Sequence, residues 1–123
     1  MAFPPHIYLA VKMLPHLVEC AKTGRQTTYK ELSVAVNVKT GQFHRSLAFI
    51  RDQICDRHKL PPLTALIQYP AKETYQNSFD PERWSNLNPT EYNEYKDQML
   101  QKVYAYEKWD MALTGLQAMY HTA

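Results

Sequence analysis

An apolar residue recurs every three or four positions in the middle of the first half of the chain, and this spacing constrains the fold more than any other feature. It predicts a helix over residues 41–58 with one buried face. That face carries Phe43, Leu47, Ile50 and Ile54. The helix should end at residues 59–62 (KLPP), because consecutive prolines cannot continue it. Its apolar face requires a core supplied by neighbouring segments.

Residues 6–23 show the same spacing, which predicts a first helix that is apolar on one side. Gly24 supplies the left-handed conformation at which many helices end. Pro15 lies inside the segment and lacks the amide hydrogen that a helix interior uses, so we expect a kink or a new turn there.

Thr28 and Glu31 have the spacing of a capping box, in which each side chain bonds the main-chain amide of the other residue. The box predicts a second, short helix through position 36. Its inward side is expected to carry Leu32, Ala35 and Val36. A turn over residues 37–41 follows, with Thr40 as the cap of the next helix.

A small β-hairpin is predicted after these helices. Residues 63–69 (LTALIQY) are apolar and bounded by prolines, which is typical of a buried strand. A second strand near residues 74–79 would pair with it through a turn at residues 70–73.

The C-terminal part is expected to be irregular over residues 80–88 and helical beyond them. Asn88, a proline at the next position and Glu91 together form a helix-start signal. Apolar and aromatic residues then recur at helical spacing to the end of the chain. Because about 30 residues is long for one globular helix, we expect a break near Asp110.

This order of elements predicts a mainly α protein of the α+β class, with the length of one domain. Residues 1–79 would form a winged-helix-like three-helix core with a small β-hairpin wing. Residues 80–123 would form an irregular connector and a C-terminal helical extension packed on the same domain. In a winged helix, the third helix enters the DNA major groove with its N-terminal outward residues facing the bases.

The formal net charge of +2 hides an uneven distribution. Residues 1–60 hold nine basic and four acidic side chains, whereas residues 61–123 hold five basic and eight acidic ones. A basic first half favours a face that binds a polyanion.

Glycine and cysteine usage narrows the class of protein further. The three glycines are not spaced to cradle a phosphate, which excludes P-loop and dinucleotide-binding sites. Cys20 and Cys55 form no CxxC pair, and we expect a cytoplasmic protein with reduced thiols and no membrane association. Cys55 and His58 lie one turn apart, but zinc needs about four ligands, so no metal or other cofactor is expected.

Two segments carry a resemblance to a known family. GRQTTYKEL at residues 24–32 and HRSLA at residues 44–48 resemble the DNA-binding part of alkylguanine-DNA alkyltransferases and alkyltransferase-like proteins, whose pattern reads GxVTTYGELA and then ARAVG. The resemblance implies that Tyr29 presses a backbone phosphate during base flipping and that Arg45 fills the vacated stack. The family's PCHR nucleophile motif is missing, since residues 60–66 read LPPLTAL, so we reject alkyl transfer. The layout also resembles small bacterial and phage proteins, some of them linked to restriction and defence loci.

The leading hypothesis is a non-enzymatic module that binds double-stranded DNA. With the apolar face inward, Gln42, Arg45 and Ser46 should point outward from the third helix. The expected contacts are Arg25, Tyr29, Lys39, Gln42 and Arg45. For Tyr29, packing at the helix start is the alternative interpretation, and for Arg45 it is an ordinary solvated charge.

The competing hypothesis is a protein-interaction component or homodimer. There the tyrosine-rich C-terminal helix would contact a partner together with Trp84 or Trp109, because tryptophan is enriched at interface hot spots. An enzyme is least favoured, because the sequence contains no evident nucleophile–base pair, carboxylate dyad or metal cluster.

Overall fold

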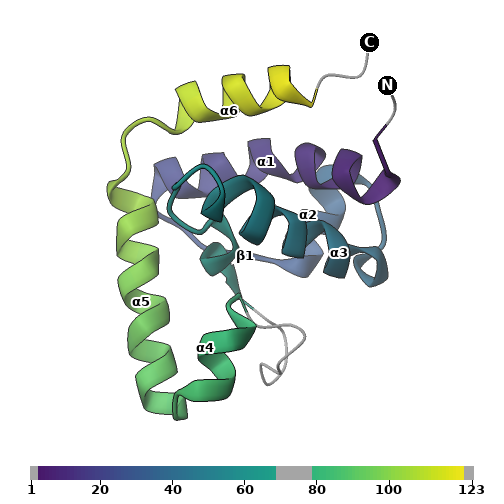
Figure 1. Cartoon of the computed structure of the whole chain (residues 1–123). Coiled ribbons are helices and arrows are strands. Elements are labelled where there is room, and N and C mark those ends of the chain that lie inside the picture. The colour runs from purple at the N-terminus through teal and green to yellow at the C-terminus, as the bar shows by residue number, and fades with distance from the viewer. Residues whose placement is uncertain (1–2, 69–78, 121–123) are drawn as a thin grey trace.

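The computed structural model describes residues 3–68 and 79–120, and within them the chain is mainly helical with a two-stranded parallel sheet (Figure 1). The elements in chain order are α1 (Pro5–Thr23), β1 (Thr27–Thr28), α2 (Tyr29–Val36), η1 (Thr40–Gln42), α3 (Phe43–Phe49), η2 (Ile50–Asp56), η3 (Leu63–Leu66), β2 (Ile67–Gln68), α4 (Pro81–Asn86), α5 (Pro89–Ala105) and α6 (Trp109–Met119). Helices η1 and η3 are 3-10 turns, and η2 is π-helical.

Helix α1 is the central element of the core. Gly24 ends it with a φ of 69°, as predicted. The helix is continuous at Pro15, which is exposed, so no new helix begins there. Its buried face carries Leu9, Ala10, Met13, Leu14, Leu17, Val18, Cys20 and Ala21.

The start of α2 is capped by Thr28, whose side chain accepts a hydrogen bond of 3.1 Å from the Glu31 amide. The reciprocal half of the predicted capping box is wrong. The Glu31 carboxylate instead accepts hydrogen bonds from the Thr27 hydroxyl and the Arg25 guanidinium, each at 3.2 Å. Both donors, the charged Arg25 and the buried Thr27, bind the same oxygen of the Glu31 carboxylate, Oε2.

Two other local expectations around the turn are corrected, and the predicted end of the second helix at position 36 is confirmed. Ala35 is exposed, whereas Leu32 and Val36 are buried as predicted. Asn37 ends α2 in the left-handed region with a φ of 56°. Thr40 does not cap α3 but begins the 3-10 turn η1.

The predicted helical rod is confirmed in α3 and η2. All four residues of its apolar stripe are buried, and the rod passes from α-helical to π-helical geometry at residue 50. The π-helical part ends at Asp56, slightly before the predicted end.

The strand predicted over residues 63–69 is largely wrong. Residues 63–66 form the buried 3-10 turn η3, because a short apolar run does not distinguish a strand from a buried turn. Only Ile67 and Gln68 are extended, and they pair in parallel with Thr27 and Thr28 of β1. The predicted second strand and its turn lie outside the described residues except for Phe79, which is buried.

The C-terminal part contains one helix that the sequence did not indicate. Residues predicted as irregular form α4, whose first turn is capped by the Asp80 carboxylate accepting from the Arg83 amide at 3.1 Å. The capping box of Asn88 and Glu91 at the start of α5 is confirmed in both directions. The expected break lies at residues 106–108, just before α6.

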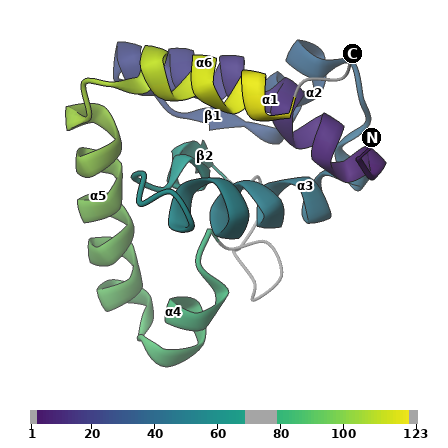
Figure 2. The ribbon, with the colours of Figure 1, turned by 45° about the horizontal axis from the view of Figure 1, so that its top comes forward.

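Helix α6 runs antiparallel along α1 (Figure 2). At one end, the Lys22 ammonium lies 2.9 Å from the Asp110 carboxylate, and at the other, the rings of Phe3 and Tyr120 lie 5.4 Å apart. Helix α5 packs against α1 and η3. The buried apolar residues of both halves therefore form one core cluster.

Candidate nucleic-acid interface

The first turn of α3 is fixed to the first turn of α1. Phe43 and Leu47 anchor its inner face in the core, and the Ser46 hydroxyl donates a hydrogen bond of 2.7 Å to the main-chain oxygen of His6. Ser46 was expected to point outward, and that prediction is wrong. The N-terminal turn of α1 covers this position, so Ser46 is completely buried.

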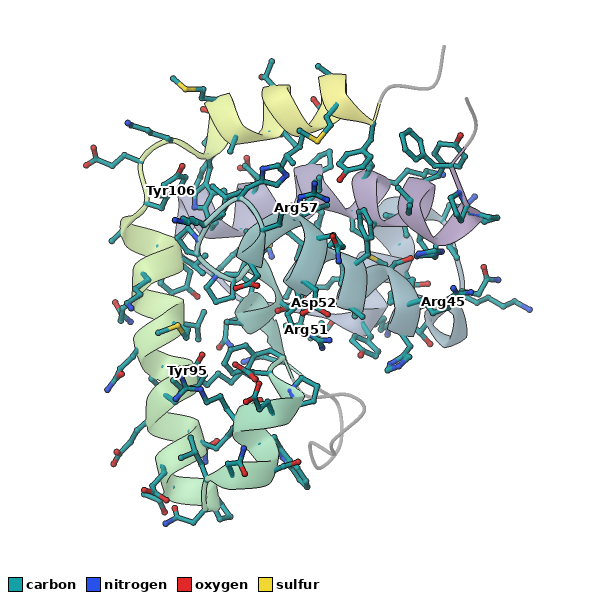
Figure 3. All side chains as sticks on the ribbon, in the orientation of Figure 1. Arg45, Arg51, Asp52, Arg57, Tyr95 and Tyr106 are labelled. Carbon is teal, nitrogen blue, oxygen red and sulfur yellow. The ribbon has the colours of Figure 1, made fainter. Side chains whose placement is uncertain are left out.

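A concave surface of about 470 Å³ lies beside this junction, and we call it the α1–α3 groove. Its two charged side chains are Lys12 from α1 and Arg45 from α3, both exposed. Figure 3 shows Arg45 at this end of the molecule. None of the described lining residues is acidic: they are Pro4, Pro5, His6, Tyr8, Leu9, Lys12, Val38, Gln42 and Arg45.

Two further residues of the expected contact set lie near the start of α3. Lys39 is exposed and directly precedes η1, next to Val38, which lines the groove. Tyr29 is half-buried, and its ring packs edge-on to Phe43 with 5.7 Å between centroids. The fold thus gathers Lys39, Gln42 and Arg45 in one segment and sets Tyr29 against the buried side of that segment.

Arg25 does not join this group. It follows the C-terminal end of α1, where its guanidinium lies 3.2 Å from the Glu31 carboxylate. Arg45 lies beside the opposite end of α1. That helix has 19 residues, which corresponds to a length of about 28 Å. The two arginines are therefore separated by about the length of this helix and form no common patch.

A partly buried hydrogen-bond network lies next to Arg25. Thr27 is fully buried, and its hydroxyl lies 2.7 Å from His16 Nε2 and 3.2 Å from a Glu31 carboxylate oxygen. A hydroxyl has one hydrogen, which the carboxylate accepts, so His16 must donate through Nε2. Burial lowers the pKa of His16, the charge of Arg25 lowers it further, and Glu31 opposes both. The imidazole is therefore neutral at pH 7.

This network contains a cysteine–histidine pair that could suggest a nucleophile. The Cys20 sulfur lies 3.7 Å from His16 Nε2, but it is fully buried, and burial raises the pKa of the thiol. An activated cysteine needs a lowered pKa and partial exposure. The network therefore ties α1, β1 and α2 together, and Cys20 lacks the environment of an activated nucleophile.

The second half of the rod formed by α3 and η2 borders a groove that, unlike the α1–α3 groove, contains carboxylates. Arg51 is paired with Asp52 through two hydrogen bonds of 2.9 Å. Both residues, labelled in Figure 3, line this second, larger groove toward α4 and α5. Asp80 and Glu82 contribute carboxylates to this groove. The middle of the rod therefore presents a paired arginine beside carboxylates, unlike its first turn.

The two tryptophans expected at a partner interface differ in position. Trp109 is only 1% exposed, and its indole donates a hydrogen bond of 2.9 Å to the main-chain oxygen of Val103. It belongs to the core, so a direct partner contact by this residue is ruled out by its burial. Trp84 lies on α4 and is 36% exposed.

Sequence reasoning missed Lys12 and His6 as members of the candidate site. Lys12 lies on the polar side of the first helix, which identifies it as exposed. Its nearness to Arg45 depends on how α1 crosses α3, and no local signal carries that information.

Comparison of the chain with protein-family models, with curated proteins and with solved structures found no match. Within residues 3–68 and 79–120, no three His, Cys, Asp or Glu side chains are grouped closely enough to hold a metal ion. No helix in these two ranges has the length and apolar character needed to cross a membrane. Any functional assignment therefore depends on the surface chemistry of the grooves.

Proposed function

We propose that this chain is a non-enzymatic module that binds double-stranded DNA through the first turn of α3. The observation that carries the proposal is the α1–α3 groove, where Lys12 and Arg45 present two cations and no described lining residue is acidic. A groove whose described lining holds two cations and no carboxylate suits a phosphate backbone, because no like charge inside the groove opposes its approach.

The order of α2, a short turn and α3 is compatible with helix-turn-helix docking. A helix with its side chains is about 10–12 Å across, and the major groove of B-DNA is about 12 Å wide. In the proposed complex, Arg45 and Gln42 face base edges, where arginine pairs with guanine and glutamine with adenine. Lys12 and Lys39 contact phosphates, and these contacts set the register.

Of the other two residues in the expected contact set, the proposal keeps Tyr29 as a DNA contact and leaves out Arg25. Tyr29 borders the same helix start and keeps the phosphate contact that the family resemblance implies. Arg25 is left out because it lies at the far end of α1 and is paired with Glu31. With two or three phosphates contacted, log K should fall with log salt at a slope of about −2 to −3.

The test is fluorescence anisotropy of a labelled duplex at about 50 mM and about 200 mM salt. Arg45→Ala and Lys12→Ala should each weaken binding about five- to tenfold at the lower salt, the loss of one close phosphate or base contact. Lys102→Ala on the exposed side of α5 is the matched control, since it removes the same charge elsewhere. Equal affinities for Arg45→Ala and Lys102→Ala would reject the interface.

A protein-interaction component is the second candidate function. It is favoured by Met111 and Met119 of α6, which are 72% and 53% exposed, and by the exposed Trp84. Light scattering at several protein concentrations distinguishes the two candidates. A salt-insensitive dimer without duplex affinity would favour this second function.

A further inference from the structure

The larger groove has two walls from distant parts of the chain. One wall is a stripe along α3 and η2 that runs from His44 to Asp56, and the other is formed by the start of α4 and the side of α5. The groove has a volume of about 740 Å³, and we call it the α3–α5 groove. This volume lies within the range of protein sites that hold a ligand or a short segment.

The most buried lining residues of the groove are apolar, and we call them its floor. Cys55 and Phe79 are 1% and 2% exposed, and the half-buried Leu60 and Met99 continue the same surface. Burial raises the pKa of the Cys55 thiol to about 12, so this thiol is neutral. The floor therefore favours aliphatic groups over charged ones.

The rims carry negative charge on both sides. Asp52 and Asp56 lie on the η2 side, and Asp80 and Glu82 lie on the α4 side. Arg51 is the one lysine or arginine among the described lining residues, and Asp52 pairs with it. An anionic ligand is disfavoured by these carboxylates, and a neutral ligand would desolvate them without compensation.

The α5 side of the groove already packs against one guanidinium of the chain itself. The Tyr95 ring stacks on Phe79 with 5.6 Å between centroids, and the Arg83 guanidinium lies 4.8 Å from the centre of the Tyr95 ring. The Tyr95 hydroxyl donates to the Asp80 carboxylate at 3.1 Å. Aromatic rings next to carboxylates attract cations both through the ring face and through the charge.

We propose that the α3–α5 groove binds an extended basic segment of a partner protein. Its Lys or Arg side chains place their aliphatic stems on the apolar floor and their charged ends between the two carboxylate rims. The stripe from His44 to Asp56 is about 18 Å long. An extended peptide of about six residues covers this length, which favours a peptide over a small polyamine. This groove is separate from the α1–α3 groove, so the peptide-binding proposal does not depend on the DNA-binding proposal.

The test uses a fluorescein-labelled peptide of about eight residues with alternating arginine and leucine, titrated with the full chain and followed by anisotropy. Asp80→Asn with Glu82→Gln should weaken binding about tenfold by removing two rim charges. Asparagine caps a helix as well as aspartate does, so α4 should be retained. The matched control is Glu94→Gln with Asp97→Asn, which removes two exposed charges of α5 that do not line the groove.

A second peptide that alternates arginine and glycine tests the apolar floor and should bind about tenfold more weakly than the arginine–leucine peptide. Circular dichroism of each variant checks that the fold is retained. The proposal is overturned if the arginine–leucine peptide does not bind, if the two double variants lose affinity equally, or if both peptides bind alike. Any of these results would leave the DNA titration unaffected.

Discussion

The Ser46 hydroxyl donates a hydrogen bond of 2.7 Å to the main-chain oxygen of His6, and this bond joins the start of α3 to the first turn of α1. The two residues are 40 positions apart in the chain. Because Ser46 follows Arg45 directly, the bond also sets the position of Arg45 beside Lys12 in the α1–α3 groove. This contact favours the observed crossing of the two helices, since another crossing would leave the buried Ser46 hydroxyl without its acceptor.

Replacing this serine should destabilise the fold. Ser46→Ala removes this hydrogen bond between the two helices, and we expect the free energy of unfolding to fall by about 1 kcal/mol. Urea denaturation measures the change. Ser85→Ala is the matched control, since Ser85 is exposed on the short helix α4. Identical midpoints for both variants would show that the hydroxyl does not contribute.

The two arginines at opposite ends of α1 should behave differently toward DNA. Arg25→Ala is expected to bind the labelled duplex within about twofold of the unchanged chain, whereas Arg45→Ala loses affinity. The Arg25–Glu31 pair is about half exposed, so its loss should cost less than about 1 kcal/mol of stability. If Arg25→Ala weakens binding as much as Arg45→Ala does, then DNA contacts the other end of the molecule.

Stability should depend on pH through His16. Its pKa is lowered in the folded protein, so the unfolded chain binds the proton more readily as the pH falls below about 6.5. The free energy of unfolding should therefore decrease through this window, with no contribution from His16 above it. His16→Gln should remove this part of the pH dependence in urea titrations. His58→Gln, at an exposed position, should retain it.

Both cysteine thiols should be unreactive in the folded protein. Cys20 and Cys55 are buried, and burial raises the pKa of each, that of Cys55 to about 12. Because the thiolate is the reactive species, an aromatic disulfide reagent should label them only as fast as the chain opens. Full labelling should appear in strong denaturant. Immediate reaction of one thiol under native conditions would contradict the burial of that residue.

Most signals that act within one or two turns were predicted correctly from the sequence, although the Glu31 half of the Thr28 capping box and the Thr40 cap were not. The stop at Gly24, the capping box of Asn88 and Glu91, and the buried stripe of α3 and η2 are all present in the structure. Each depends on main-chain geometry or on residues three to four positions apart, so the local sequence is sufficient. The strand over residues 63–69 was predicted wrongly, because an apolar run between prolines fits a buried 3-10 turn equally well.

The candidate sites depended on contacts between distant segments. The sequence predicted Gln42 and Arg45 on the exposed start of a helix, and both are exposed there. It did not predict the burial of Ser46 beneath α1. It also did not predict that Lys12 and Arg45 line the same groove, or that Arg25 lies far from Arg45.

What the sequence alone determined is where most helices begin and end and which of their faces are apolar. What only the tertiary structure decided is which exposed faces share a groove and which charges are paired. The physical reason is that a helix start is specified by hydrogen bonds within one turn of chain. The sign of the charge that lines a groove depends instead on side chains such as Asp52 and Asp80, which packing places on opposite walls of the same groove.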